Sequence, residues 1–319
     1  IEMNPSDDTG YSMAVSVGTG VVSIANSLKK IKPDIVLVLG DRIEALSAAI
    51  AAAYMNIPVA HIHGGDVTRA GLDESARHAI TKFSHIHLAA TEKSAERILK
   101  MGEDPWRVHV VGAPALDPIV NYSADLDEIA KRYGLDTSKP IVLLLQHSVT
   151  TAADDAAAQI RETLDAITEM KLQTIAVYPN SDAGGRKIIS VLKEYEKYPF
   201  IKVFKSIPHD DYIGLMRIAS VKVGNTSSGI IEAPSLNLPS VNIGTRQEGR
   251  ERGYNVIDVD HDREHIKSAI KKALYDEAFK KKVSECSSPY GNGTAGIKIA
   301  DILSKIKIDK ALLQKKLTY

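Results

Sequence analysis

Apolar and polar positions along this chain follow two periods, and each period predicts one kind of element. Short runs rich in Val, Ile and Leu recur, and runs of this length predict buried parallel strands. Longer stretches between them carry apolar residues every three or four positions, which predicts amphipathic helices. The predicted strands cover residues 35–39, 58–62, 86–90 and 107–111, and then 141–145, 172–178, 201–205, 221–224, 240–243 and 255–259.

Repeated strand–helix units of this kind predict an α/β fold with parallel sheets. Charged and turn-forming residues over 125–140 are typical of an interdomain linker. We therefore expect two Rossmann-like domains, over residues 1–135 and 136–300, followed by a helix and tail over 301–319. The helices predicted between the strands cover 42–55, 73–84, 92–101, 152–170 and 184–198, and a last one covers 294–308.

The first residues do not match the start of such a domain. Residues 1–10 are polar, and a helical pattern begins near Ser12. An α/β domain usually begins with a strand, which a Gly-rich phosphate loop often follows. We therefore expect that residues are missing before Ile1.

Five predicted strands end in a group of glycine, charged, histidine, amide or hydroxyl residues. In open α/β sheets, ligands bind beyond the carboxyl ends of the strands. The pattern therefore predicts one ligand-binding cleft that the two domains face. The five groups are Gly40-Asp41-Arg42, His63-Gly64-Gly65-Asp66, Gln146-His147-Ser148, Asn225 to Gly229, and Gly244-Thr245-Arg246.

The composition of the chain limits the kinds of molecule that it is expected to bind. The chain has 319 residues, of which 44% are hydrophobic, and its 40 basic and 40 acidic residues give a formal net charge of zero. This balance argues against a nucleic-acid or membrane partner bound through bulk charge. The single cysteine, Cys286, excludes an intrachain disulfide and fits a reducing cytosol, so we expect a cytoplasmic protein.

The segment 225–232 is a candidate phosphate site. Hydroxyls and backbone N–H groups at a helix start bind phosphate, which points to Asn225, Ser227, Ser228 and Gly229. Glu232, about one turn further on, could accept both hydroxyls of a ribose. The structural alternative for the same residues is a serine N-cap with a capping-box glutamate, without any bound phosphate.

Candidate polar groups also follow the first two strands. Asp41 is either a carboxylate held in the cleft or a structural ion pair or N-cap. His61 and His63 point to one side if their strand continues. A metal site there is disfavoured, since spacing fixes no third ligand and the adjacent glycines indicate close approach of the backbone to a ligand. One of the two histidines is expected to be packed and hydrogen-bonded.

Residues 73–78 begin a helix with acidic residues in its first turn. The helix dipole alone favours Asp73 and Glu74 there, and Asp73 with Arg77 forms an (i, i+4) pair. The functional alternative is a first-turn carboxylate that faces the cleft as an acid or base.

Three further residues are candidates in the second half. His147 could bind phosphate or protonate a leaving group. His209, at the start of a predicted helix, is either a turn residue or a nucleotide contact. Arg246 lies in a charged loop that is either solvent-exposed or an anion clamp.

Together these segments resemble the UDP-N-acetylglucosamine 2-epimerase family, and more closely its hydrolysing, sialic-acid-pathway branch. Their order and spacing run through nearly the whole chain. A family Gly-x-Arg loop near the start has no match here, whereas His63 and Arg42 favour the hydrolysing branch. The matching segments are Val38-Leu-Gly-Asp-Arg42, His61-Ile-His-Gly-Gly-Asp66, residues 73–82, Gln146-His147, residues 179–184, residues 224–229, and residues 242–251.

The resemblance implies a glycosyltransferase-B-like architecture whose C-terminal helix returns to the first domain. It implies that UDP leaves C1 as a proton is taken from C2, and that water then adds to the glycal, giving N-acetylmannosamine and UDP. Neither a cofactor nor an essential metal is implied, and a homodimer or homotetramer is expected. The implied acid/base candidates are Asp41 and Glu74, with Asp73 as the rival; Arg77 orients the site, His147 assists the departing phosphate, His63 and Asp66 line the sugar pocket, Ser227, Ser228 and Gly229 hold the diphosphate, and Glu232 holds the ribose.

Other functions remain open from the sequence. The chain could be a non-hydrolysing 2-epimerase, or could take a UDP-diacetylbacillosamine-type sugar. A glycosyltransferase-B enzyme would transfer the sugar to an acceptor. A nucleotide-sugar-binding regulator would bind UDP without turnover.

Overall fold

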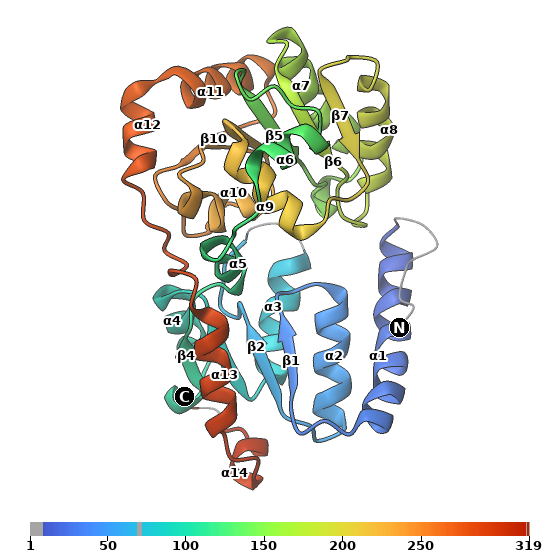
Figure 1. Cartoon of the computed structure of the whole chain (residues 1–319). Coiled ribbons are helices and arrows are strands. Elements are labelled where there is room, and N and C mark those ends of the chain that lie inside the picture. The colour runs from blue at the N-terminus through green and yellow to red at the C-terminus, as the bar shows by residue number, and fades with distance from the viewer. Residues whose placement is uncertain (1–8, 69–71, 317, 319) are drawn as a thin grey trace. The chain divides into compact units, whose positions relative to one another are not determined.

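The computed structural model describes residues 9–68, 72–316 and 318, which divide into two compact units (Figure 1). Unit 1 combines Ile1–Asp117 with Tyr290–Tyr319, and unit 2 is Pro118–Pro289. Most of the polar segment at residues 1–10, and any strand before it, lies outside the described residues.

Unit 1 contains a four-stranded parallel sheet whose strands follow chain order. Helix α1 lies beside α2 (Figure 1). The strands are β1 (Val36–Leu39), β2 (Val59–Ile62), β3 (Ile86–Ala89) and β4 (Val108–Val110), and the helices are α1 (Gly10–Ile31), α2 (Ile43–Tyr54), α3 (Leu72–Phe83), α4 (Glu92–Lys100), α13 (Ala295–Lys305) and α14 (Lys310–Leu313), with α5 (Asp117–Val120) at the boundary.

The core of unit 1 explains why the C-terminal segment belongs to it. Strands β2 and β3 are buried along their whole length, as continuous apolar runs require. On one face Ile62 and Leu88 pack in a cluster with Ile299 of α13 and Leu312 of α14. Burying these side chains stabilises the return of the chain by about 25 cal/mol per Å² of apolar surface.

Unit 2 contains a six-stranded parallel sheet in the order β10-β9-β8-β5-β6-β7. One face packs against α7, α8 and α11, and the other packs against α6 and α9. The strands are β5 (Ile141–Leu145), β6 (Gln173–Val177), β7 (Ile201–Phe204), β8 (Val221–Gly224), β9 (Ser240–Ile243) and β10 (Val256–Val259), and the helices are α6 (Leu126–Arg132), α7 (Ala156–Glu169), α8 (Gly185–Tyr195), α9 (His209–Ile218), α10 (Ser228–Ile231), α11 (Arg263–Tyr275) and α12 (Glu277–Ser284).

The strand order of unit 2 reverses between β5 and β8. From β5 the chain proceeds outward to β6 and β7, and then returns to place β8 on the other side of β5. Such a reversal opens a crevice beyond the carboxyl ends of the two strands, and doubly wound sheets bind ligands there. The topology therefore singles out the segments that follow Leu145 and Gly224.

The α/β fold and the parallel strands predicted from the sequence are confirmed, and the predicted strands agree with the observed ones within one residue at each end. The predicted linker over 125–140 differs. Its first half forms α6, which Asp125 caps by accepting from the amides of Asp127 and Glu128. Ile129 and Tyr133 of this segment are buried against Leu215 of α9. The unit boundary accordingly falls at residue 117 instead of 135, and the second boundary falls at 289 instead of 300.

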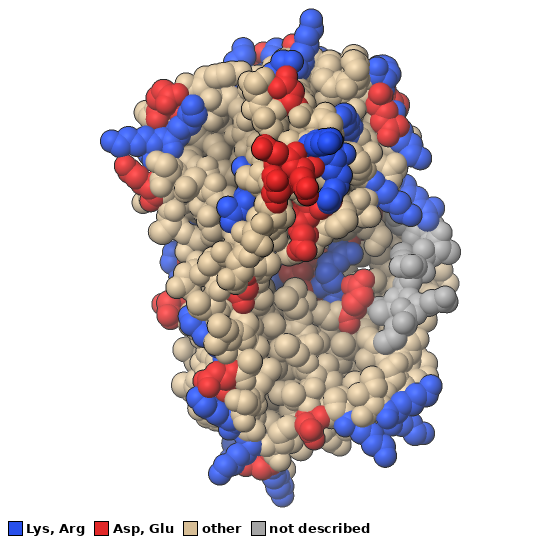
Figure 2. All heavy atoms as spheres, viewed as in Figure 1, with Lys and Arg blue, Asp and Glu red and all other residues tan. Residues whose placement is uncertain are grey.

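Side chains of both charges are present on the visible surface. Figure 2 shows basic and acidic side chains lying next to one another on that face, with uncharged residues between them. Within the described part of the chain, no helix is both long enough and apolar enough to cross a membrane.

Candidate functional site

Arg77 of α3 is the centre of a polar cluster in unit 1. Its side chain is 1% exposed, and each of its five N–H groups can be matched to one acceptor. Nε and one Nη2 N–H donate to Oδ2 of Asp41, with Nε···Oδ2 at 2.9 Å. The others donate to Oε2 of Glu74 at 2.6 Å, the hydroxyl of Thr68 at 2.7 Å and the carbonyl of Asp66 at 2.8 Å. One buried cation therefore fixes both predicted acid/base carboxylates.

Of the structural alternatives for Asp41, the ion pair is present, with Arg77 as its partner, and the N-cap is wrong. Arg42, not Asp41, is the N-cap residue of α2, and no side-chain hydrogen bond caps that helix. Arg77 pairs with Glu74 and with Asp41, and its five N–H groups are used without Asp73. Of the two rival first-turn acids, Glu74 accepts a hydrogen bond from Arg77.

Glu74 is held in its charged form. Burial raises the pKa of its carboxyl, but the Thr68 amide at 2.8 Å and the Arg77 guanidinium outweigh burial, so the pKa lies below its usual value. Its other oxygen is 3.1 Å from Nε2 of His78. The Asp41 and Glu74 side chains remain 19% and 30% exposed, so a ligand can reach both.

The turn after β2 presents His63 and Asp66. His63 adopts φ +65°, a left-handed conformation that is uncommon for a non-glycine residue. Its Nδ1 is 3.0 Å from Oδ2 of Asp66, and the hydroxyl of Ser94 donates to the other oxygen of Asp66 at 2.9 Å. Gly65 is required here, since a Cβ on it would lie 2.1 Å from the Ser94 carbonyl.

His61 is the packed, hydrogen-bonded histidine that the sequence predicted. It is fully buried, and its Nε2 donates to the Gly40 carbonyl at 2.8 Å, immediately before Asp41. Burial lowers the pKa of His61 to about 4, so the ring is neutral at pH 7. Because the strand ends at Ile62 and His63 turns away, the two histidines do not share one face. The described residues contain no group of three or more metal-ligating side chains.

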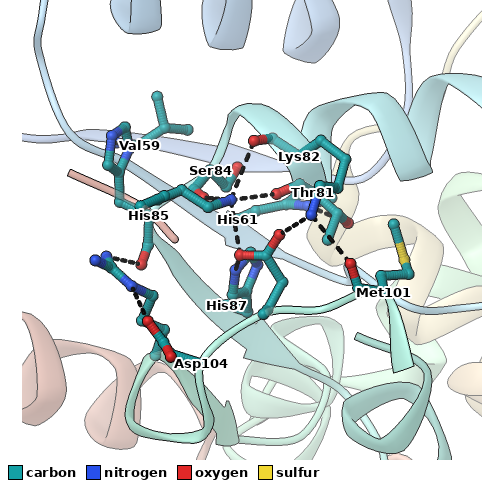
Figure 3. A network of polar contacts seen from close by, with 12 residues as sticks. Val59, His61, Thr81, Lys82, Ser84, His85, His87, Met101 and Asp104 are labelled. Carbon is teal, nitrogen blue, oxygen red and sulfur yellow. Dashed lines mark hydrogen bonds and ion pairs between the residues drawn. The ribbon is translucent and has the colours of Figure 1, made fainter. Parts of the chain in front are cut away.

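A buried polar network lies next to His61 (Figure 3). Its centre is the carboxylate of Glu103, which accepts from Lys82 at 2.7 Å, His87 at 2.9 Å and Lys315 at 2.7 Å. Burial raises the pKa of Glu103, but these three partners lower it to about 2 overall. Since Lys315 lies beyond α14, the network also ties the C-terminal segment to the sheet of unit 1.

In unit 2, Asn225 joins the segments that follow β5, β8 and β9. Its side chain accepts from the His147 amide at 2.7 Å and donates to the His147 carbonyl at 2.9 Å. Its carbonyl accepts from Arg246 at 3.3 Å and from Gln247 at 2.9 Å. Three of the predicted strand-end groups are therefore brought together by one buried amide at the switch point.

The ring of His147 is oriented by the backbone. The Asn180 amide donates to its Nδ1 at 3.1 Å. Nδ1 is therefore an acceptor, which places the proton of the neutral ring on Nε2. The sequence predicted His147 as a site residue but not Asn180, although residues 179–184 were among the segments that resemble the family.

The capping-box interpretation of residues 227–232 is confirmed only for the N-cap position of Ser227. Ser227 is the N-cap residue but makes no side-chain cap hydrogen bond, and Glu232 follows the last residue of α10. Helix α10 spans only four residues, so its dipole is weak and the hydroxyls matter more. Gly229 packs closely, because a Cβ on it would lie 2.3 Å from the Ser240 hydroxyl. His209, the first residue of α9, is exposed.

A cavity of about 780 Å³ opens beyond β9 and β10. Thr245, His261 and His265 line it, together with Thr151 from the segment after β5. Gly244 and Thr245 of a predicted strand-end group line this cavity, so it adjoins the segments after β5 and β9 that Asn225 joins, although none of the individually named candidate residues lines it.

The fold and the two clusters define a class of protein: an α/β protein of two parallel-sheet units, with a carboxylate–arginine cluster in one and an amide- and hydroxyl-rich switch point in the other. A family model described as UDP-N-acetylglucosamine 2-epimerase matches residues 1–304. The chain belongs to this family.

Individual relatives agree with this assignment. A UDP-N,N'-diacetylbacillosamine 2-epimerase (hydrolyzing) of Legionella pneumophila is 41% identical over 306 residues, covering 95% of this chain and 79% of the relative. A UDP-N-acetylglucosamine 2-epimerase of Neisseria meningitidis serogroup B is 35% identical over 265 residues, covering 83% and 70%. The solved structure of a UDP-GlcNAc 2-epimerase from Neisseria meningitidis bound to UDP-GlcNAc has the same fold, with a TM-score of 0.78, 19% identity, and coverage of 92% of this chain and 82% of that one.

Proposed function

We propose that this chain is a hydrolysing UDP-N-acetylglucosamine 2-epimerase, which converts UDP-N-acetylglucosamine and water into N-acetylmannosamine and UDP. The observation that carries the proposal is the Arg77 cluster, in which one buried guanidinium holds the carboxylates of Asp41 and Glu74. Family membership supplies the reaction class, and the cluster supplies the acid/base groups that this reaction needs.

Asp41 is the group that we assign to the C2 proton. Arg77 donates twice to its Oδ2, so its Oδ1 lies outside these two hydrogen bonds and can accept a proton. As C2 loses its proton, the electron pair forms the C1–C2 double bond and the C1–oxygen bond breaks, so UDP leaves as an anion. Glu74 is the second acid/base candidate, and His63 and Asp66 contact the sugar.

The leaving diphosphate is assigned to the switch point of unit 2. The hydroxyls of Ser227 and Ser228, the backbone of Gly229 and the guanidinium of Arg246 are donors for an anion. Asn225 positions this region, and Nε2–H of His147 can donate to the departing phosphate oxygen. Glu232 takes the ribose hydroxyls and His209 contacts the nucleotide.

Hydration completes the proposed reaction. Water adds its oxygen to C1 of the glycal, and C2 receives a proton on the face opposite to the one that lost it. The product is free N-acetylmannosamine, with the configuration at C2 inverted. We also propose that the protein acts in the cytoplasm as a homodimer or homotetramer.

A second candidate substrate has support of its own. The relative from Legionella pneumophila, 41% identical to this chain, is described as acting on UDP-N,N'-diacetylbacillosamine. The same elimination and hydration apply to that sugar, since the chemistry lies at C1 and C2.

Proton NMR in heavy water tests the proposal. The protein is incubated with UDP-N-acetylglucosamine, and separately with the diacetylbacillosamine derivative. Free UDP with a mannosamine product deuterated at C2 is the expected result for the true substrate. A product that is still linked to UDP would indicate the non-hydrolysing reaction. UDP binding without turnover of either sugar would contradict the proposal and favour a binding protein.

A further inference from the structure

A lysine lies in the middle of the central sheet of unit 2. Lys222 of β8 is 1% exposed, and its neighbours in register are Leu143 of β5 and Ser240 of β9. Leu143 belongs to the apolar cluster on the α6 and α9 face of the sheet. Burying an ammonium is costly unless it is paired, so a lysine at this position needs a structural or functional reason.

A series of hydrogen bonds connects the ammonium of Lys222 to the proposed nucleotide site. It donates to the Tyr212 hydroxyl at 2.7 Å, and that oxygen is 3.0 Å from the hydroxyl of Ser228. Charged lysine can only donate, so when Lys222 is protonated Tyr212 accepts from it and the Tyr212 proton is free for Ser228. Ser228 then directs its proton away from Tyr212, and its hydroxyl is 3.5 Å from the Thr226 hydroxyl, to which it donates. This series of hydrogen bonds therefore orients the Ser228 hydroxyl as a donor.

The groups around Lys222 do not fully compensate the cost of burying its positive charge. On β5 and β9 its neighbours are Leu143 and Ser240, and on α9 its partner is Tyr212, whose ring centroid is 5.2 Å from Nζ. Glu232, after α10, is the charged group that acts on it. Burial lowers the pKa of Lys222 to about 7 although Glu232 raises it, so the site can still accept positive charge near neutral pH.

We propose that Lys222, acting through Tyr212 and Ser228, is a positioning residue for the diphosphate of a nucleoside diphosphate, and that it takes up a proton when that anion binds. The inference deepens the proposed function and rests on it. An anion hydrogen-bonded to Ser228 favours the charged form of Lys222, and the charged form in turn favours Ser228 as a donor. The two effects are reciprocal.

Calorimetry of UDP binding tests the proposal. UDP is titrated into the full chain at pH 7.5 in buffers of different ionisation enthalpy, which gives the number of protons taken up. We expect an uptake of about half a proton or more for the native chain, since the pKa of Lys222 rises through the working pH. We expect Lys222→Met to abolish this uptake and to weaken UDP binding by about tenfold.

Two further variants separate positioning from packing. Tyr212→Phe keeps Lys222 but removes the linking hydroxyl, and we expect it to weaken UDP binding and reduce proton uptake. Lys202→Met makes the same replacement on β7 of the same sheet, where the ammonium donates to the carbonyls of Tyr133 and Gly134. This control should leave affinity and proton uptake unchanged.

The outcomes distinguish this proposal from the proposed function. Equal affinity and equal proton uptake in the native chain, Lys222→Met and Tyr212→Phe would overturn the role of Lys222 while leaving UDP binding intact. A native chain that binds no UDP would contradict both. A loss of affinity in Lys222→Met without a change in proton uptake would reduce Lys222 to a packing residue.

Discussion

Arg77 binds a single carboxylate oxygen, Oδ2 of Asp41, through both Nε and Nη2. The two residues are 36 positions apart, one directly after β1 and the other in α3. Because both donors converge on Oδ2, the carboxylate is fixed in position while Oδ1 lies outside these two hydrogen bonds. A proton-transfer group needs this combination of fixed geometry and an available oxygen.

The first prediction concerns Asp41→Asn. The amide keeps the size of the side chain but cannot accept the C2 proton, so kcat should fall by about 10² to 10⁴. UDP affinity should stay within about twofold, because the UDP contacts are assigned to unit 2. Steady-state kinetics and calorimetry measure the two quantities. Asp154→Asn, at an exposed aspartate paired with Lys187, is the control and should leave both unchanged. Turnover at the native rate in Asp41→Asn would remove Asp41 from the mechanism.

The second prediction concerns Arg77→Lys. Lysine has three donors instead of five and no planar fork, so at least two of the five hydrogen bonds that Arg77 donates are lost. The free energy of unfolding should fall by about 2–4 kcal/mol, and kcat should fall as well. Urea denaturation checks this loss. Arg161→Lys changes an exposed pair with Glu194 and should cost less than about 0.5 kcal/mol. Equal stability losses in the two variants would show that the buried hydrogen bonds of Arg77 add little.

The third prediction concerns the turn after β2. Gly65→Ala places a Cβ 2.1 Å from the Ser94 carbonyl at φ +75°, so the backbone must move. We expect a loss of about 2 kcal/mol or more in the free energy of unfolding, together with a reduced kcat, since Asp66 follows directly. Gly18→Ala is the matched control. A Cβ at Gly18 in α1 meets nothing within 4 Å, and alanine should stabilise the helix by about 0.5–1 kcal/mol. Destabilisation by both substitutions would contradict the role assigned to the turn.

The fourth prediction concerns acid sensitivity of unit 1. Burial lowers the pKa of His61 and of His85 to about 4, and it also lowers that of His87. The folded state therefore binds fewer protons than the unfolded state between pH 6.5 and pH 4. The contribution of these histidines to the free energy of unfolding is fully present above about pH 6.5. It is lost as the pH falls towards 4, by at most about 1.4 kcal/mol per pH unit for each ring.

Urea denaturation at pH 7.5, 6.5, 5.5 and 4.5 checks this dependence. In His85→Gln the side-chain oxygen can still accept from the Val59 amide, which donates to Nδ1 in the native chain at 3.1 Å. This variant cannot titrate, so its stability should decline less steeply over the same interval. A native chain with constant stability from pH 6.5 to 4.5 would contradict the prediction. Glu103 stays charged in the folded state throughout, because its pKa lies at about 2, and it adds to the decline only near pH 4.5, where the unfolded carboxyl begins to bind protons.

Much of the fold follows from local patterns. Runs such as 141–145 are apolar on both faces, which only a doubly covered strand explains, and the helices between strands repeat every three or four residues. The same rule located the strand-end groups that contain Asp41, His63, His147 and Asn225. The predicted linker failed because its charged residues lie on the exposed side of α6, while Ile129 supplies a buried position that the composition did not reveal.

The sequence alone therefore determined the class of fold, the strands, and a set of candidate residues that includes Asp41, Glu74 and Arg77. Only the tertiary structure decided which candidates act together. Asp41 and Arg77 meet because β1 and β2 are neighbours in register, and His147 meets Asn225 because β8 returns beside β5. Lys222 gave no local signal, since its role depends on the face of the sheet that it shares with Tyr212. Periodicity is a property of neighbours in the chain, whereas these contacts depend on strand order and register across the sheet.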